Sequence, residues 1–283
     1  MSIRSMLPIA VAALAVAGAA AIAGPALAAD DPPRTQYHEM HANCTVNHTL
    51  SDDPIVFPGL PGASHNHSFI GNPSVNANST PQSLVGGATS CEDTLDASGY
   101  WFPTLLQRGV PLQPDKPTVY YKSAVRDYRT VKPFPAGFKL LVGDAKTPDV
   151  AHFTGNWQCT GYKGTDIPPS CPAGATLQVR LTAPSCWDGV HLDTADHKSH
   201  MAWPVSGVCP ADHPVPLPML EIKLPYPLKN GDTGGLAYAS GASYTFHYDF
   251  MNGWDPARQS YLVQYCINGG RQCNGFGEDP KNP

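Results

Sequence analysis

The sequence predicts a mainly β protein, a single-domain antiparallel β-sandwich of jelly-roll type with long loops, disulfides and one short C-terminal helix. Two observations predict this class. The chain has 30 prolines and 26 glycines among 283 residues, and proline interrupts both helices and central strands. Between these breakers lie short runs rich in β-branched and aromatic residues, which are typical of strands joined by turns. The runs are residues 100–106, 118–125, 138–143, 176–182, 219–224 and 243–250.

One helix is expected near the C-terminus. Asp255 offers an N-cap, and Pro256 follows at the first helical position, where proline is favoured. Tyr261, Leu262 and Tyr265 then recur at helical spacing, and the helix is expected to end before Gly269.

The first 28 residues resemble an export signal. Arg4 precedes an almost wholly apolar run over residues 6–23, and Ala26-Leu27-Ala28 forms a cleavage motif. We therefore expect cleavage after Ala28 and a secreted protein, with no membrane association after cleavage. The rest of the chain is interpreted as an N-terminal extension over 29–43, one domain over 44–274 and a flexible tail over 275–283.

The charge pattern disfavours two kinds of partner. The formal net charge is −5 at pH 7, and the chain contains no basic run. Nucleic acids and anionic membranes attract clustered lysine and arginine, so neither is an expected partner. We expect a monomer.

Eight cysteines follow the signal segment, and an even number in an oxidising compartment predicts four disulfides. Spacing alone does not fix their connectivity, but pairing in sequence order closes loops of modest length. Zinc ligation by cysteine is disfavoured because the chain has no C-x-x-C spacing. The expected pairs are Cys44–Cys91, Cys159–Cys171, Cys186–Cys209 and Cys266–Cys273.

Two histidines, His65 and His67, lie either side of one residue. On an extended segment this spacing directs both imidazoles to one face, which is how a strand offers two nitrogen ligands to one metal. The alternative is a loop whose histidines bond to backbone groups.

A second polar segment places Asp193, Asp196, His197 and His200 within eight residues. His197 and His200 share one face of a helical turn at this spacing, and an aspartate beside them can orient an imidazole. Alternatively, the aspartates cap a turn.

A third segment alternates polar and aromatic residues. In residues 246–250, His247 and Asp249 are expected on one side of a strand, opposite Phe246, Tyr248 and Phe250. This pattern favours a lined cleft, although a polar face turned to solvent gives the same alternation.

Four ordered motifs together resemble the DUF1996 family, a domain of unknown function found in secreted proteins. They are DPIVFPGLPGASHNHSFIGN, SCWDGVHLDTADHKSHMAWP, GVCPADHPVPLPMLEIKLPYP and FHYDFMNGWD. The resemblance runs from about Cys44 to Cys266 and includes the family patterns S-H-x-H, D-H-x-S-H-M and H-x-D-F. It implies a secreted single domain, and the activity of the family is not established.

We expect His65, His67, His200, His247 and Asp249 to converge in one cleft of a secreted hydrolase or lyase acting on an extracellular polymer, with polysaccharide as the leading substrate class. His247 is the expected general base or acid, with Asp249 or Asp193 as the second charge. In a metal-assisted variant, His65, His67 and His247 hold zinc or copper. The residues expected to stack on sugar rings are Trp187, Trp203 and Trp254.

Two other interpretations remain open at this stage. One is a non-catalytic module that holds a glycan or a metal. The other is a disulfide-rich scaffold in which the polar clusters only stabilise loops, since histidine is also an ordinary hydrogen-bonding residue.

Overall fold

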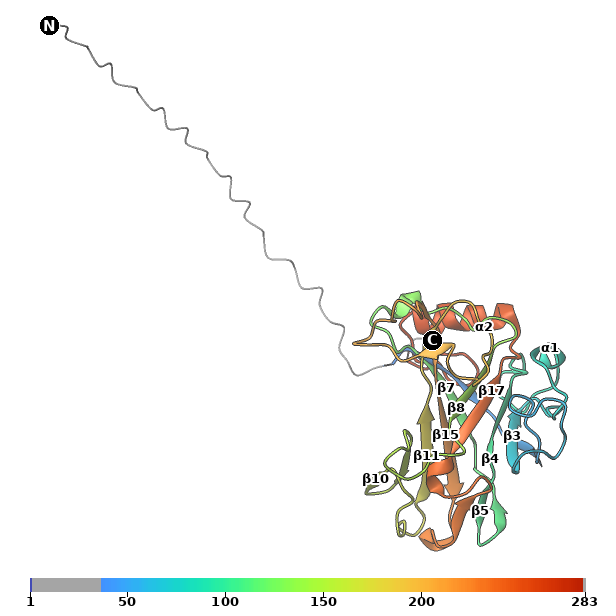
Figure 1. Cartoon of the computed structure of the whole chain (residues 1–283). Helices are drawn as coiled ribbons and strands as arrows, with labels where there is room; N and C mark the ends of the chain where they lie inside the picture. Colours follow the sequence, from blue (N-terminus) through green and yellow to red (C-terminus); the bar gives the residue numbers. More distant parts are fainter. Residues whose placement is uncertain (2–36, 282–283) are drawn as a thin grey trace. The chain divides into compact units, whose positions relative to one another are not determined.

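Two antiparallel sheets carry most of the fold in the computed structural model, which describes Met1 and residues 37–281 (Figure 1). One sheet has six strands in the order β1-β7-β15-β11-β9-β10, and the other has five in the order β2-β3-β4-β17-β8. The strands of the first are β1 Glu39–Asn43, β7 Thr118–Lys122, β15 Met219–Pro227, β11 Thr176–Thr182, β9 Asn156–Cys159 and β10 Tyr162–Gly164. Those of the second are β2 Val46–Leu50, β3 His67–Gly71, β4 Gly99–Pro103, β17 His247–Met251 and β8 Lys139–Gly143.

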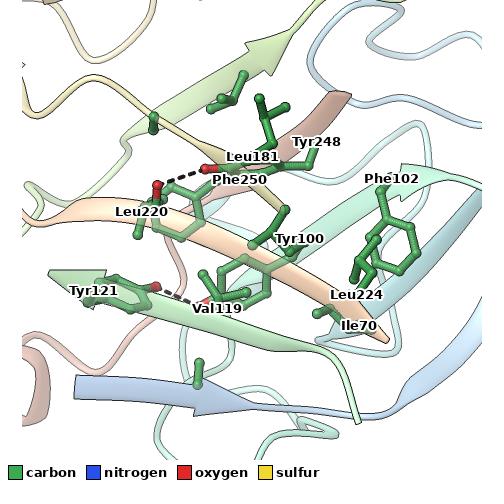
Figure 2. Packing of buried hydrophobic residues seen from close by; sticks show 14 of the residues in the cluster. Ile70, Tyr100, Phe102, Val119, Tyr121, Leu181, Leu220, Leu224, Tyr248 and Phe250 are labelled. Atoms are coloured by element: carbon green, nitrogen blue, oxygen red, sulfur yellow. Dashed lines mark hydrogen bonds between the residues drawn. The ribbon is translucent and has the colours of Figure 1, made fainter. Parts of the chain in front are cut away.

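The main core lies between these two sheets. Alternate residues of each strand point inward, so Tyr248 and Phe250 of β17 lie in the same cluster as Val119 and Tyr121 of β7 (Figure 2). Tyr121 reaches across to Tyr100 of β4 through a hydroxyl contact of 2.6 Å. The predicted sandwich is therefore confirmed.

The connections carry two small sheets and several short helices. One small sheet consists of β16 Leu236–Tyr238, β5 Leu105–Gln107 and β6 Val110–Leu112. The other consists of β13 Met201–Ala202, β12 Cys186–Trp187 and β14 Val215–Pro216. The short helices are α1 Pro81–Leu84, η1 Tyr128–Thr130, η2 Lys229–Gly231 and η3 Ser243–Thr245. No helix among the described residues is long and apolar enough to cross a membrane.

The expected C-terminal helix is present. α2 Pro256–Leu262 begins where predicted and continues directly as the wider helical segment η4 Val263–Asn268. The Asp255 carboxylate accepts a hydrogen bond from the Arg258 backbone N–H, which satisfies a donor at the helix start.

The central strand β15 contains prolines, contrary to the expectation that they interrupt central strands. β7 pairs with β15 only as far as Lys223, and Pro225 and Pro227 lie beyond that point. Because the neighbour on that side has ended, their missing N–H groups remove no ladder hydrogen bond.

The four expected disulfides form in sequence order. They link the termini of strands and helices to the loops that follow them. Loop closure in the unfolded chain is their main contribution to stability, on the order of 2 to 4 kcal/mol each.

The expected domain boundaries need two corrections. Residues 39–43 were assigned to an extension but form β1, in which Met40 is 1% exposed. Within the expected flexible tail, Asp279 is 2% exposed, so this end packs onto the domain. Apart from Met1, the expected signal peptide lies outside the described residues, and so do residues 29–36.

The five-stranded sheet is covered on its other face as well. A second apolar cluster lies there, which we call the outer cluster, and residues 51–98 contribute much of it. Its members are Ile55, Phe69, Val75, Leu84, Trp101 and Met251. Polar residues on this same face are therefore enclosed rather than exposed to solvent.

Candidate metal centre

The outer face of the five-stranded sheet gathers polar residues from distant parts of the chain. Tyr248 and Phe250 of β17 point into the main core, so His247 and Asp249 point to the other side. Asp249 lies opposite Trp101 of β4, which in turn lies opposite Phe69 of β3. His67 precedes Phe69 by two residues and shares its face. Strand order thus brings the first and last motifs together.

Three imidazoles converge at this point. The ring centroids of His65 and His67 are 4.3 Å apart, those of His65 and His247 are 5.0 Å apart, and those of His67 and His247 are 5.8 Å apart. One ring nitrogen of each lies within 4.8 Å of one ring nitrogen of both others. Two nitrogens on one tetrahedral zinc lie roughly 3.4 Å apart, so a small inward rotation of the rings would suffice.

Backbone carbonyls determine which nitrogen each buried ring presents. His67 Nδ1 lies 3.0 Å from the Asp52 carbonyl oxygen, and His247 Nδ1 lies 2.8 Å from the Thr245 carbonyl oxygen. A carbonyl oxygen only accepts, so each Nδ1 carries the proton and each Nε2 keeps a lone pair. Nε2 of His67 is buried without a partner, and so is Nε2 of His65. This anchoring is the usual outer support of metal-binding histidines.

Burial keeps these imidazoles neutral. Desolvation lowers the pKa of His65, lowers that of His67 well below its usual value, and lowers that of His247 to about 4. The neighbouring imidazoles add to the effect at His67 and His247. Neutral imidazole is the form that binds metal, so no proton has to leave at neutral pH.

Two buried carboxylates adjoin the imidazoles. Asp249 is 0% exposed and neither of its oxygens has a hydrogen-bond partner, while Asp53 accepts from the backbone N–H groups of Ile55 and Val56. Asp53, His67 and Asp249 form a second group of potential ligand atoms within 4.8 Å of one another. Burial, and then the nearby Asp53, raise the pKa of Asp249 well above its usual value.

Sequence reasoning missed Asp53. It is the first residue of the motif that contains His65 and His67, and its i, i+2 and i, i+3 backbone bonds mark a turn. That local role gave no reason to expect it beside Asp249.

A cavity of about 520 Å³ opens over the histidines. His65 and His247 line it directly, whereas His67 is fully buried beneath. A ligand entering the cavity would therefore meet the imidazoles of His65 and His247, with that of His67 behind them. Its polar lining is Asp53, Ser64, His65, Asp144, Lys146, Asp196, His197 and His247.

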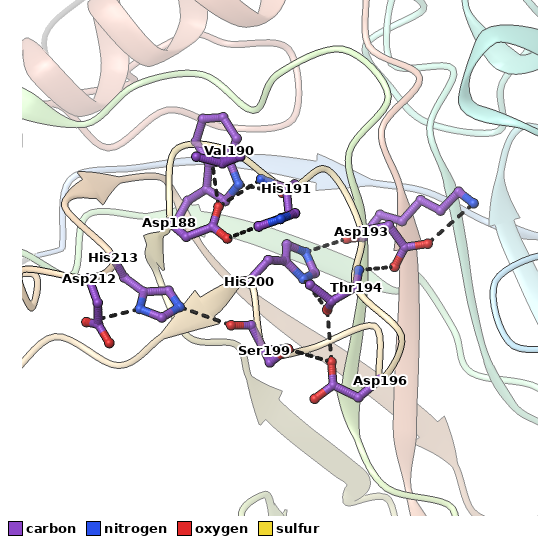
Figure 3. A network of polar contacts seen from close by, with 12 residues as sticks. Asp188, Val190, His191, Asp193, Thr194, Asp196, Ser199, His200, Asp212 and His213 are labelled. Atoms are coloured by element: carbon purple, nitrogen blue, oxygen red, sulfur yellow. Dashed lines mark hydrogen bonds and ion pairs between the residues drawn. The ribbon is translucent and has the colours of Figure 1, made fainter.

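His200 belongs to a different network, which corrects its expected place in the shared cleft (Figure 3). Its Nε2 donates to the Lys139 carbonyl oxygen at 2.9 Å, its Nδ1 contacts the Thr194 hydroxyl, and its ring packs on Phe138. Asp193 contacts His197 rather than His200, at 2.7 Å. His197, which was not among the expected site residues, is the histidine of this segment that lines the cavity.

The three tryptophans differ in their surroundings. Trp254 is 2% exposed and donates to the Tyr121 hydroxyl, so the expectation that it stacks on a sugar is wrong. Trp187 is half-buried and donates to the His191 carbonyl oxygen. Trp203 is 52% exposed and lines a second cavity of about 240 Å³, which shares Leu141 with the histidine cavity.

Fold and site together define a disulfide-linked β-sandwich protein in which buried histidine and aspartate side chains bring possible metal-ligand atoms within 4.8 Å of one another. A family model described as a domain of unknown function, DUF1996, matches residues 53–254. The chain belongs to this family. No curated protein and no solved structure matches it.

Proposed function

We propose that this protein is a secreted, metal-assisted hydrolase or lyase that acts on an extracellular polymer, with polysaccharide as the leading substrate class. His65, His67 and His247 would hold one divalent ion, zinc or copper, and Asp249 would supply a nearby carboxylate. The observation that carries the proposal is the pair of unpartnered Nε2 atoms in His65 and His67, beside the anchored His247, at the floor of a cavity. An unpaired buried polar atom is costly, and a bound cation removes that cost.

The donor set suits these metals. Imidazole nitrogen binds both zinc and copper, and three histidines leave a coordination position free for water or substrate. The lining of the cavity supports the same conclusion, because His65 and His247 face it while His67 closes the rear. When bound, the ion would polarise a substrate oxygen or a water molecule.

An extended substrate is supported by the neighbouring cavity. Leu141 borders both cavities, and Trp203 borders the second with half of its surface exposed. A sugar ring stacked on Trp203 and a scissile bond placed over the histidines would thus belong to one long substrate molecule. This arrangement suits a polymer better than a small molecule.

A non-catalytic module that holds a metal or glycan is the second candidate. It is favoured by the deep burial of His67 and Asp249, which are both 0% exposed. In that case the ion would mainly stabilise the outer face of the sheet.

Elemental analysis of the full chain, purified without a polyhistidine tag, tests the metal. We expect about one equivalent of zinc or copper, and a loss of affinity of more than about 100-fold in His67→Ala and in His247→Ala. His200→Gln is the matched control, because His200 is equally buried but lies outside the site. Metal loss in all three variants alike, or no metal in the parent protein, would contradict the assignment.

A polysaccharide degradation screen with and without chelator separates the two candidates. Products that form only with bound metal support the enzyme. Stoichiometric metal and glycan retention without products support the binding module.

A further inference from the structure

We propose that His197 is the general acid–base residue of the histidine cavity and that Asp193 is its positioning residue. This inference rests on the proposed metal site, but it concerns a different segment of the chain.

The first observation is the contact between the two side chains. His197 Nδ1 lies 2.7 Å from Asp193 Oδ1, and Lys139 Nζ lies 3.5 Å from the other carboxylate oxygen. A carboxylate accepts, so His197 carries its proton on Nδ1 and keeps a lone pair on Nε2. An aspartate that fixes an imidazole in this tautomer leaves Nε2 available to take up a proton.

The second observation is the position of the ring. His197 lines the same cavity as His65 and His247, but it comes from the loop that runs along the free edge of β8 rather than from the sheet. It also lies close to Asp53: burial raises the pKa of Asp53, and the nearby His197 opposes that rise. A molecule in the cavity could therefore meet the imidazole of His197 as well as those of His65 and His247.

The third observation is the backbone of His197. Its φ is +59°, a left-handed conformation that favours glycine, and a histidine there costs on the order of 1 kcal/mol. Two hydrogen bonds hold it: its N–H donates to the Thr194 carbonyl oxygen at 2.9 Å, and its carbonyl oxygen accepts from Leu141 N–H at 3.0 Å. The loop thus fixes a strained residue where its side chain reaches the cavity.

The chemistry balances without a further reactant. In hydrolysis, Nε2 takes a proton from the attacking water as its oxygen bonds to the substrate. The resulting imidazolium returns that proton to the leaving oxygen as the scissile bond breaks. One water is consumed, and His197 is regenerated.

His191 provides a matched comparison within the same segment. Its Nδ1 lies 2.6 Å from Asp188 Oδ2, so the pairing is the same, but its side chain is 60% exposed and it does not line the cavity. Its contact with Asp188 organises the loop. Location, rather than the histidine–aspartate contact itself, distinguishes His197.

The test uses the full chain loaded with cobalt(II), whose visible spectrum reports the protonation of groups at the metal. Because His197 lines the same cavity as two of the proposed ligands, we expect the spectrum of the parent protein to change with pH in two steps, and that of His197→Gly in one. Glycine suits the left-handed backbone, so this variant should fold and bind cobalt with unchanged stoichiometry. Asp193→Asn should bind cobalt with unchanged stoichiometry and weaken the second step, because an amide does not hold His197 in the Nδ1–H tautomer as a carboxylate does.

His191→Gly is the control and should reproduce the parent titration. Identical titrations for the parent protein and His197→Gly would overturn the role of His197 while leaving the metal site intact. Failure of the parent protein to bind cobalt would instead contradict the metal site on which the role depends. Restoration of the second step when imidazole is added to His197→Gly would support the assignment directly.

Discussion

Two fully buried aspartates, Asp96 and Asp249, differ in their hydrogen-bond partners. Asp96 accepts from the Ser98 N–H at 3.1 Å and from the Tyr100 hydroxyl at 2.8 Å. That hydroxyl continues to Tyr121, which accepts from Trp254 Nε1. Asp249 has no donor to either oxygen. Both side chains are 0% exposed.

This difference separates a structural carboxyl group from one suited to a ligand. Burial raises the pKa of Asp96 to about 6, with its donors opposing the rise, whereas burial and Asp53 raise the pKa of Asp249 well above its usual value. Cys44 and Cys91 lie near Asp96 but are joined in a disulfide, so they offer no thiolate. Of these two aspartates, Asp249 is the one that combines unfilled acceptors with neighbouring neutral imidazoles.

Removing the satisfied carboxyl group should have the largest effect on stability. Asp96→Ala leaves two buried donors with fewer acceptors and opens a void, so we expect the free energy of unfolding to fall by about 4 kcal/mol. Urea denaturation measures this, and metal stoichiometry should stay unchanged. A loss below about 1 kcal/mol would mean that the Asp96 network is not structural.

The histidine site should make the metal-free protein sensitive to acid. The pKa of His247 falls from 6.5 to about 4 on folding. As the pH falls, the unfolded chain therefore takes up a proton before the folded protein does. The free energy of unfolding is unaffected above pH 6.5 and decreases as the pH falls toward 4. The loss is about 3 kcal/mol for a shift of this size. His247→Gln should lack this loss of stability at low pH. The measurement is the difference in the free energy of unfolding between variant and parent protein as a function of pH. A constant difference from pH 7 to pH 4 would argue against a buried neutral imidazole.

Removing the unsatisfied carboxyl group should have the smallest effect on stability. In the metal-free protein Asp249→Ala breaks no hydrogen bond, so only packing is lost and we expect a change of about 1 kcal/mol or less. Metal affinity should fall by about 10-fold or more, as for residues that support a metal site. Equal destabilisation by Asp249→Ala and Asp96→Ala would remove the distinction between the two groups.

The features that depend on local pattern could be predicted from the amino-acid sequence. Alternation along residues 246–250 placed His247 and Asp249 on one face, and the i, i+2 spacing brought His65 and His67 together. Proline and glycine density predicted short strands, and Asp255-Pro256 predicted the start of α2. The pairing of cysteines in sequence order also followed, because each pair closes a loop within one region of the fold.

Which of these faces meet depends on strand order and on the paths of the loops, and local patterns do not encode either. Asp53 joins the site because residues 51–66 fold over β3 and β17, and no periodicity in its own turn encodes that contact. His197 rather than His200 reaches the cavity because the 192–197 segment runs along β8 and turns at a left-handed residue. Trp254 is buried because its indole N–H meets a hydroxyl on the opposite sheet. Spacing fixes the direction of a side chain relative to its neighbours, whereas strand order and loop path fix what lies in that direction.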